Sequence, residues 1–150
     1  MYVSQIVMSS LPNIELVSLL IILITRKFGI KALYSVYVFV GCEILTYGIS
    51  EWVINYLYVW AILCLVIMTI RRIDVAVFYA LISAVFGILF GTLCSIPSFI
   101  IGGIPMGISY ILSGFWFDIL HCSGNFILVM LLYKPLTKAL NKAIKTINSM

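Results

Sequence analysis

The sequence predicts an all-α integral membrane protein, a six-helix transmembrane bundle, from its composition, its apolar runs and the placement of its charges. Of the 150 residues, 64% are hydrophobic and only 9% are charged, whereas about a quarter of the residues in a soluble domain are charged. So few polar side chains cannot cover a globule in water. The apolar runs are long and do not alternate with polar residues, which favours helices over a membrane β-barrel.

The basic residues fall in three clusters, and the loops between them contain no lysine or arginine. The clusters are Arg26, Lys27 and Lys31; Arg71 and Arg72; and Lys134, Lys138, Lys142 and Lys145. The loops without them surround Pro12, residues 48–51 and residues 102–105. Because cytoplasmic loops of membrane proteins carry an excess of Lys and Arg, we expect a protein of the cell membrane with the basic loops in the cytoplasm. The basic cytoplasmic loops explain the net charge of +4. The charge therefore does not point to a nucleic-acid partner.

The whole chain, residues 1–150, is predicted to form a single transmembrane domain. The predicted segments are residues 1–11, 13–27, 30–48, 50–72, 74–101 and 105–133. The first would cross only part of the bilayer, because a helix rises about 1.5 Å per residue. Both termini are then cytoplasmic. The amphipathic tail, residues 134–150, either lies on the anionic inner leaflet or is a solvated helix end.

Small residues recur along the fifth predicted segment. They are Ser83, Gly87, Gly91 and Ser95 at every fourth position, with Ala76, Ala80 and Ala84 beside them. Such residues let helix backbones approach closely in lipid. We expect this ridge to pack either within the bundle or against a partner subunit.

Polar residues in the last predicted segment stand where a membrane helix usually has apolar ones. Asp118, His121 and Asn125 follow the spacing i, i+3, i+7 and therefore share one helix face. Polar groups at this depth are costly and usually face the bundle interior. Two interpretations stay open: the groups pair with one another and hold neighbouring helices, or they line a water-filled cavity open to the outside. Trp116 lies beside them and offers a flat face for a ligand.

Further candidates for ligand binding lie near the predicted outer ends of the helices. They are Asn13, Glu15, Glu43, Glu51, Asn55, Tyr58 and Trp60. Asn13 and Glu15 follow a proline, so a helix-capping role is the alternative for both. Tryptophan and tyrosine at this level also form the aromatic belt of membrane proteins. A belt does not need the nearby carboxylate and amide, which favours a binding role.

The sequence contains no motif for catalysis, for ATP binding or for a metal site. It has one histidine, no HExxH and no GxxxxGK[ST] loop, and its four cysteines stand singly. Hydrolytic sites need a nucleophile with a base or several metal ligands. We therefore expect a protein that is not an enzyme and that uses no cofactor and no metal.

Four stretches of the chain together resemble the substrate-binding S component of an energy-coupling factor (ECF) transporter. They are LPNIELVSLLIIL, WVINYLYVW, SGFWFDILHCSGNF and LLYKPL. The resemblance implies a six-helix membrane protein that captures a vitamin or a related heteroaromatic micronutrient from outside. It also implies a transmembrane coupling subunit and two cytoplasmic ATPases as partners.

The chain departs from that family at its N-terminus. S components have a full-length first helix whose small residues dock onto the coupling subunit, whereas the first segment here is short. We therefore expect an incomplete first helix, and Ala76, Ala80 and Ala84 become the alternative docking ridge.

Three other functions are consistent with parts of the sequence. A stand-alone proton-coupled carrier would use Asp118 and His121 as a proton relay. An intramembrane enzyme or a scaffold without a ligand are the remaining alternatives.

Overall fold

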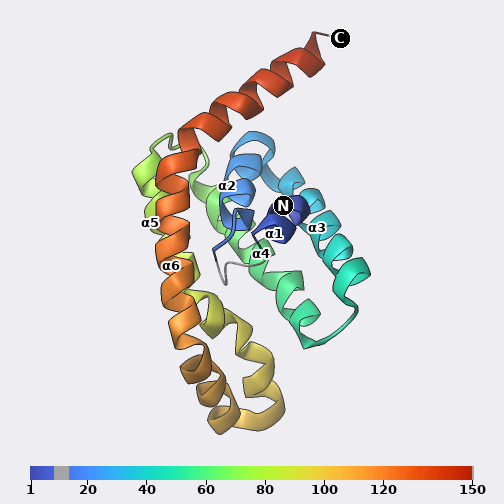
Figure 1. Ribbon diagram of the computed structural model, residues 1–150, viewed down its shortest axis with the longest axis vertical. Helices are drawn as coiled ribbons and strands as arrows, with labels where there is room; N and C mark the ends of the chain where they lie inside the picture. Colours follow the sequence, from blue (N-terminus) through green and yellow to red (C-terminus); the bar gives the residue numbers. More distant parts are fainter. Residues whose placement is uncertain (9–13, 150) are drawn as a thin grey trace.

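The computed structural model describes residues 1–8 and 14–149, and the regular secondary structure in these residues is helical (Figure 1). The elements are α1 (Tyr2–Val7), α2 (Val17–Phe28), the 3-10 turn η1 (Gly29–Lys31), α3 (Ala32–Tyr47), α4 (Glu51–Ile70), α5 (Ala76–Cys94) and α6 (Ile96–Asn148). Four helical stretches are long and apolar enough to cross a membrane: Val17–Tyr47, Glu51–Ile70, Ala76–Cys94 and Ile96–Asn148. The predicted all-α fold is confirmed, and the four long apolar stretches suggest the predicted multi-pass membrane protein. The count of six spans stays a prediction.

Two of the four stretches reverse direction within themselves (Figure 1). Gly29, in η1, has a φ of 59°, and Gly103, inside α6, has a φ of 67° with a ψ of −164°. These angles suit glycine, which has no Cβ to clash. The predicted loop at residues 102–105 is therefore present as a hairpin within α6. The predicted segment 74–101 is divided, because α5 ends at Cys94 and the first arm of α6 begins at Ile96.

α2 is short and lies at the centre of the bundle. Its 12 residues rise about 18 Å, well below the ~30 Å of a bilayer core. Five of its apolar side chains are buried in the core: Val17, Leu19, Ile21, Ile22 and Leu23. Because the helix starts late, the residues just before it lie inside the bundle, and the side chain of Glu15 is only 15% exposed.

The small-residue ridge of α5 packs against α6 of the same chain. A Cβ added at Gly87 would lie 2.7 Å from the backbone nitrogen of Cys122, and one at Gly91 would overlap the carboxylate of Asp118. Ala80 is fully buried, whereas Ala76 and Ala84 remain partly exposed. The structure therefore confirms that the ridge packs within the bundle. Docking of its alanines to a partner stays a prediction.

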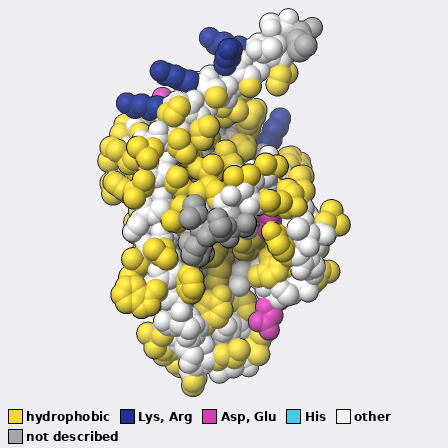
Figure 2. Space-filling view, viewed as in Figure 1, with side chains coloured by type: hydrophobic (Ala, Val, Ile, Leu, Met, Phe, Trp, Pro, Cys, Tyr) yellow, Lys and Arg dark blue, Asp and Glu magenta, His cyan; other side chains and the backbone are white. Residues whose placement is uncertain are grey.

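The basic loops come together at one end of the molecule around Arg26. Its guanidinium forms an ion pair with Asp74 at 2.9 Å, donates to the hydroxyl of Tyr133 and lies over the ring of Tyr79. Its Nε also donates to the carbonyl of Arg71 at 3.4 Å. One network thus joins α2, the α4–α5 connection and α6. Figure 2 shows lysine and arginine side chains in the half of the molecule that holds the C-terminal tail.

The tail is a continuation of α6. The helix continues through Pro135 and ends at Asn148. Figure 1 shows its last part leaving the bundle at an angle. Leu136 and Leu140 pack against the core, while Ile147 is exposed. The predicted helical tail is confirmed, and its contact with a lipid leaflet stays a prediction.

Replacing Gly87 with alanine tests the close contact between α5 and α6. We expect Gly87→Ala to lower the free energy of unfolding by roughly 1–3 kcal/mol, because the backbone of α6 must move. Gly41→Ala is the matched control, since a Cβ there meets nothing within 4 Å, and it should be neutral or stabilising by up to about 1 kcal/mol. Denaturant titration of the protein in detergent measures both. Equal effects of the two substitutions would contradict this packing.

The Arg26–Asp74 contact predicts a dependence of stability on pH. The hydrogen bond from Tyr133 and the nearby Arg26 guanidinium hold the pKa of Asp74 below its ordinary value of 3.8. A lowered carboxyl pKa stabilises the fold above the ordinary value, and this contribution is lost as the pH falls through the folded-state pKa. The exposed position of Asp74 limits the effect to about 1 kcal/mol or less. Wild type should thus lose its stability advantage over Asp74→Asn below pH 4, and a difference that does not vary with pH would contradict the assignment.

Candidate functional site

Asn125 links three helices in the interior and is only 1% exposed. Its Nδ2 donates to the hydroxyl of Ser18 on α2 at 3.3 Å and to the carbonyl of Ser83 on α5 at 3.1 Å. Both donors of the amide are thus used within the protein. These contacts support the structural interpretation for Asn125, namely that it holds neighbouring helices together.

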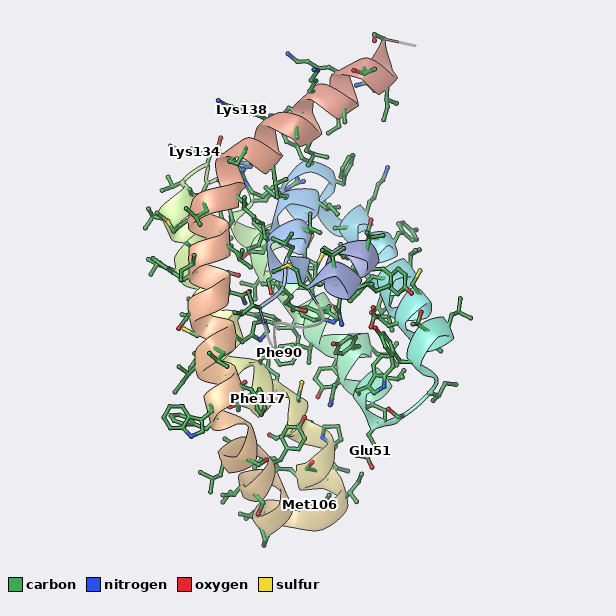
Figure 3. All side chains as sticks on the ribbon, in the orientation of Figure 1. Glu51, Phe90, Met106, Phe117, Lys134 and Lys138 are labelled. Atoms are coloured by element: carbon green, nitrogen blue, oxygen red, sulfur yellow. The ribbon has the colours of Figure 1, made fainter. Side chains whose placement is uncertain are left out.

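Asp118 lies at the boundary of a cavity between α5 and α6. Its Oδ1 accepts a hydrogen bond from the backbone N–H of Gly91 at 2.9 Å. The cavity has a volume of about 380 Å³. It is lined by Phe90, Gly91, Cys94, Tyr110, Ser113, Gly114, Phe117 and Asp118. Figure 3 labels Phe90 and Phe117 between the hairpin at Met106 and the basic end at Lys134.

The side chains of His121 and Glu15 face each other, and the ring of Phe90 packs against the imidazole. The Nε2 of His121 lies 3.5 Å from the Oε1 of Glu15, and the imidazole is only 2% exposed. Neither imidazole nitrogen has a hydrogen-bond partner among the described residues, nor has this Glu15 oxygen. A buried polar atom without a partner costs about 1–3 kcal/mol. The two side chains thus lie at ion-pair distance, and three of their buried atoms have no hydrogen-bond partner in the described part of the chain.

Glu43 and Trp60 add two further unpartnered groups from α3 and α4. One oxygen of Glu43 accepts a hydrogen bond from Gln5 of α1 at 3.3 Å, while the other has no partner among the described side chains. Trp60 is fully buried, and its indole N–H is also unpartnered within the described part of the chain. Glu43 and Glu15 lie close enough for their carboxylates to repel each other.

Aromatic rings enclose these polar groups. The ring of Phe90 lies 4.8 Å from that of His121 and 5.4 Å from that of Trp60, measured between centroids. Tyr56 and Phe39 pack on the other side of Trp60, at 5.5 Å and 6.3 Å. We call the following set the polar–aromatic cluster: Glu15, Glu43, Trp60 and His121, with the rings of Phe39, Tyr56 and Phe90. Phe90 belongs both to this cluster and to the cavity wall beside Asp118.

The other predicted site residues lie elsewhere. The Tyr58 hydroxyl donates to the carbonyl of Leu93 at 2.7 Å and lies 3.0 Å from the Oδ1 of Asn55, so this pair joins α4 to the end of α5. Trp116 is 73% exposed, so it lies at the surface and not in the buried cluster. Glu51 is exposed at the start of α4, where Figure 3 labels it. Asn13 lies outside the described residues.

Sequence reasoning did not select Phe39, Tyr56 or Phe90, which enclose the cluster. Each lies in a helix that is apolar on all sides, so no periodicity separates a ring that faces the interior from one that faces lipid. Gln5 was missed because it lies in the short N-terminal segment, for which the sequence gives no helical face.

No family model, no curated protein and no solved structure matches this chain. We therefore infer the kind of molecule that the site suits from its own side chains. It combines carboxylates, an imidazole and an indole N–H within apolar and aromatic walls. Such a site suits the binding of a small polar molecule with an aromatic ring.

Substitution of Asn125 tests its structural role. We expect Asn125→Ala to destabilise the protein by about 1–3 kcal/mol, because the two hydrogen bonds are lost and their partners stay buried. Asn148→Ala, at the exposed end of α6, is the matched control and should have little effect. Thermal unfolding in detergent compares the two. An Asn125→Ala protein as stable as the control would contradict the assignment of this amide to helix packing.

Proposed function

We propose that this protein is the membrane-embedded solute-binding subunit of an ATP-driven importer of the ECF type, and that it captures a small heteroaromatic micronutrient at the polar–aromatic cluster. The observation that carries the proposal is a set of buried polar atoms that have no hydrogen-bond partner among residues 1–8 and 14–149. These atoms come from four places in the chain: Glu15 before α2, Glu43 on α3, Trp60 on α4 and His121 on α6.

The energetic cost of these groups supports a binding role. Water is scarce inside a membrane-spanning bundle, so each unsatisfied group there costs several kcal/mol. A protein that used the four residues only for packing would gain stability from apolar replacements. A bound solute with matching hydrogen-bonding groups would satisfy them, and the surrounding rings would stack against its aromatic part.

The position of the cluster supports access from outside. The cavity beside Asp118 shares Phe90 with the cluster and lies toward the hairpin at Gly103. The basic residues gather at the opposite end, around Arg26 and Lys134 (Figures 2 and 3). With basic loops in the cytoplasm, the cavity belongs to the outer half of the protein. A solute would then pass Phe90 on its way to His121.

The energy for uptake has to come from partners in this proposal. The sequence has no nucleotide-binding loop, and the resemblance described above implies a transmembrane coupling subunit and two ATPases. The exposed apolar surface of the helices leaves room both for lipid and for such a subunit.

Small molecules retained during purification test the binding role. We expect wild type, purified in a mild detergent, to retain a heteroaromatic compound that liquid chromatography and mass spectrometry detect. Trp60→Phe and His121→Ala should each reduce its amount at least tenfold, which corresponds to the loss of about 1.4 kcal/mol of binding free energy. Trp116→Phe, at the exposed tryptophan, is the matched control and should retain as much as wild type. Equal retention in all variants would remove the cluster from the binding site.

Co-purification tests the partners and separates the proposal from its main alternative. We expect a coupling subunit and two ATPases to be recovered with the tagged chain from its native membrane. Uptake of the retained compound by this chain alone in liposomes, driven by a proton gradient, would instead support a stand-alone carrier using Asp118 and His121.

A further inference from the structure

We infer that the solute bound at the polar–aromatic cluster carries a positive charge on or beside its aromatic ring. This inference rests on the proposed function and adds the chemical class of the solute. It starts from the two carboxylates of the cluster, Glu15 and Glu43. Glu43 is 2% exposed, and each carboxylate has one oxygen without a partner among the described residues.

The negative charge of the cluster is not balanced by the residues that the structure describes. Glu15 and Glu43 repel each other, and His121, at 3.5 Å from Glu15, offers at most one positive charge. Burying a second carboxylate without a counter-charge costs several kcal/mol. A cationic solute supplies the missing charge directly.

No lysine or arginine is placed to bind an anionic solute. All nine Lys and Arg residues belong to the three basic clusters of the sequence. Arg26 is bound to Asp74 and Tyr133 at the basic end, and Arg71 packs against Gly29 there. A solute with a carboxylate or a phosphate would therefore meet two like charges in the cluster, which disfavours it by several kcal/mol.

The aromatic rings also favour a cation. The ring of Trp60 lies 5.5 Å from that of Tyr56 and 5.4 Å from that of Phe90, measured between centroids. A cation over such a face gains about 0.5–2 kcal/mol, most of all when it is removed from water. Among residues 1–8 and 14–149, no group of three His, Cys, Asp or Glu side chains is close enough to hold a metal ion. An organic cation therefore fits the cluster better than a metal ion.

A charge-sorted binding assay tests this inference. The purified protein in lipid nanodiscs is freed of small molecules by extensive washing and incubated with a complete small-molecule extract of yeast cells. Compounds that stay with the protein through gel filtration are identified by mass spectrometry and sorted by their charge at pH 7. The variants Glu15→Gln and Glu43→Gln keep the shape of the side chain and remove its charge. Glu51→Gln, at an exposed glutamate, is the matched control.

We expect wild type and Glu51→Gln to enrich a cationic heteroaromatic compound to the same extent. Glu15→Gln and Glu43→Gln should each bind it at least ten times more weakly, because one carboxylate no longer attracts it. Enrichment of an anion or a neutral compound would overturn the inference while leaving the proposed function in place, as would equal binding of a cation by all variants. Enrichment of no compound by folded, monodisperse wild type would overturn the proposed function and this inference with it.

Discussion

Burying a polar group in apolar surroundings costs free energy unless the group finds a hydrogen-bond partner. This cost governs how the chain arranges its polar side chains. The chain has few charged side chains, and two groups of them show how this cost is met. At the basic end, Arg26 is matched by Asp74, Tyr133 and a backbone carbonyl. In the interior, His121 and Glu15 face each other, and their buried polar atoms have no hydrogen-bond partner among the described residues. The first group is a complete structural network, whereas the second leaves polar atoms unsatisfied within the part of the chain that the structure describes.

Two features of the bundle bring Glu15 and His121 together in the interior. The late start of α2 at Val17 leaves Glu15 inside the protein instead of at its surface. The close approach of α5 to α6 at Gly87 and Gly91 brings His121 next to Phe90. Neither feature contributes a ligand contact by itself. Together they place a carboxylate and an imidazole from distant parts of the chain at 3.5 Å from each other.

The sequence allowed good predictions where a pattern depends on local chemistry. The composition predicted the membrane helices, the glycine-containing loop at residues 102–105 is a hairpin, and the small-residue ridge packs inside the bundle. Predictions were weaker where packing decides which way a side chain faces. Asp118, His121 and Asn125 do share a buried helix face, yet Asn125 joins helices, and the neighbouring Trp116 is exposed. The pairing of Glu15 with His121 depends on how α2 and α6 meet, which periodicity does not reveal.

Thiol labelling in sealed vesicles tests most directly whether the interior opens on the face opposite the basic residues. Cys94 lines the cavity beside Asp118, and Cys64 is fully buried in the core. In variants that keep only one of these cysteines, a small, membrane-impermeant cationic methanethiosulfonate is applied to either side of the membrane. We expect Cys94 to be labelled from the side opposite the basic loops and Cys64 not to be labelled. Labelling of Cys94 only from the side of the basic loops, or from neither side, would contradict it.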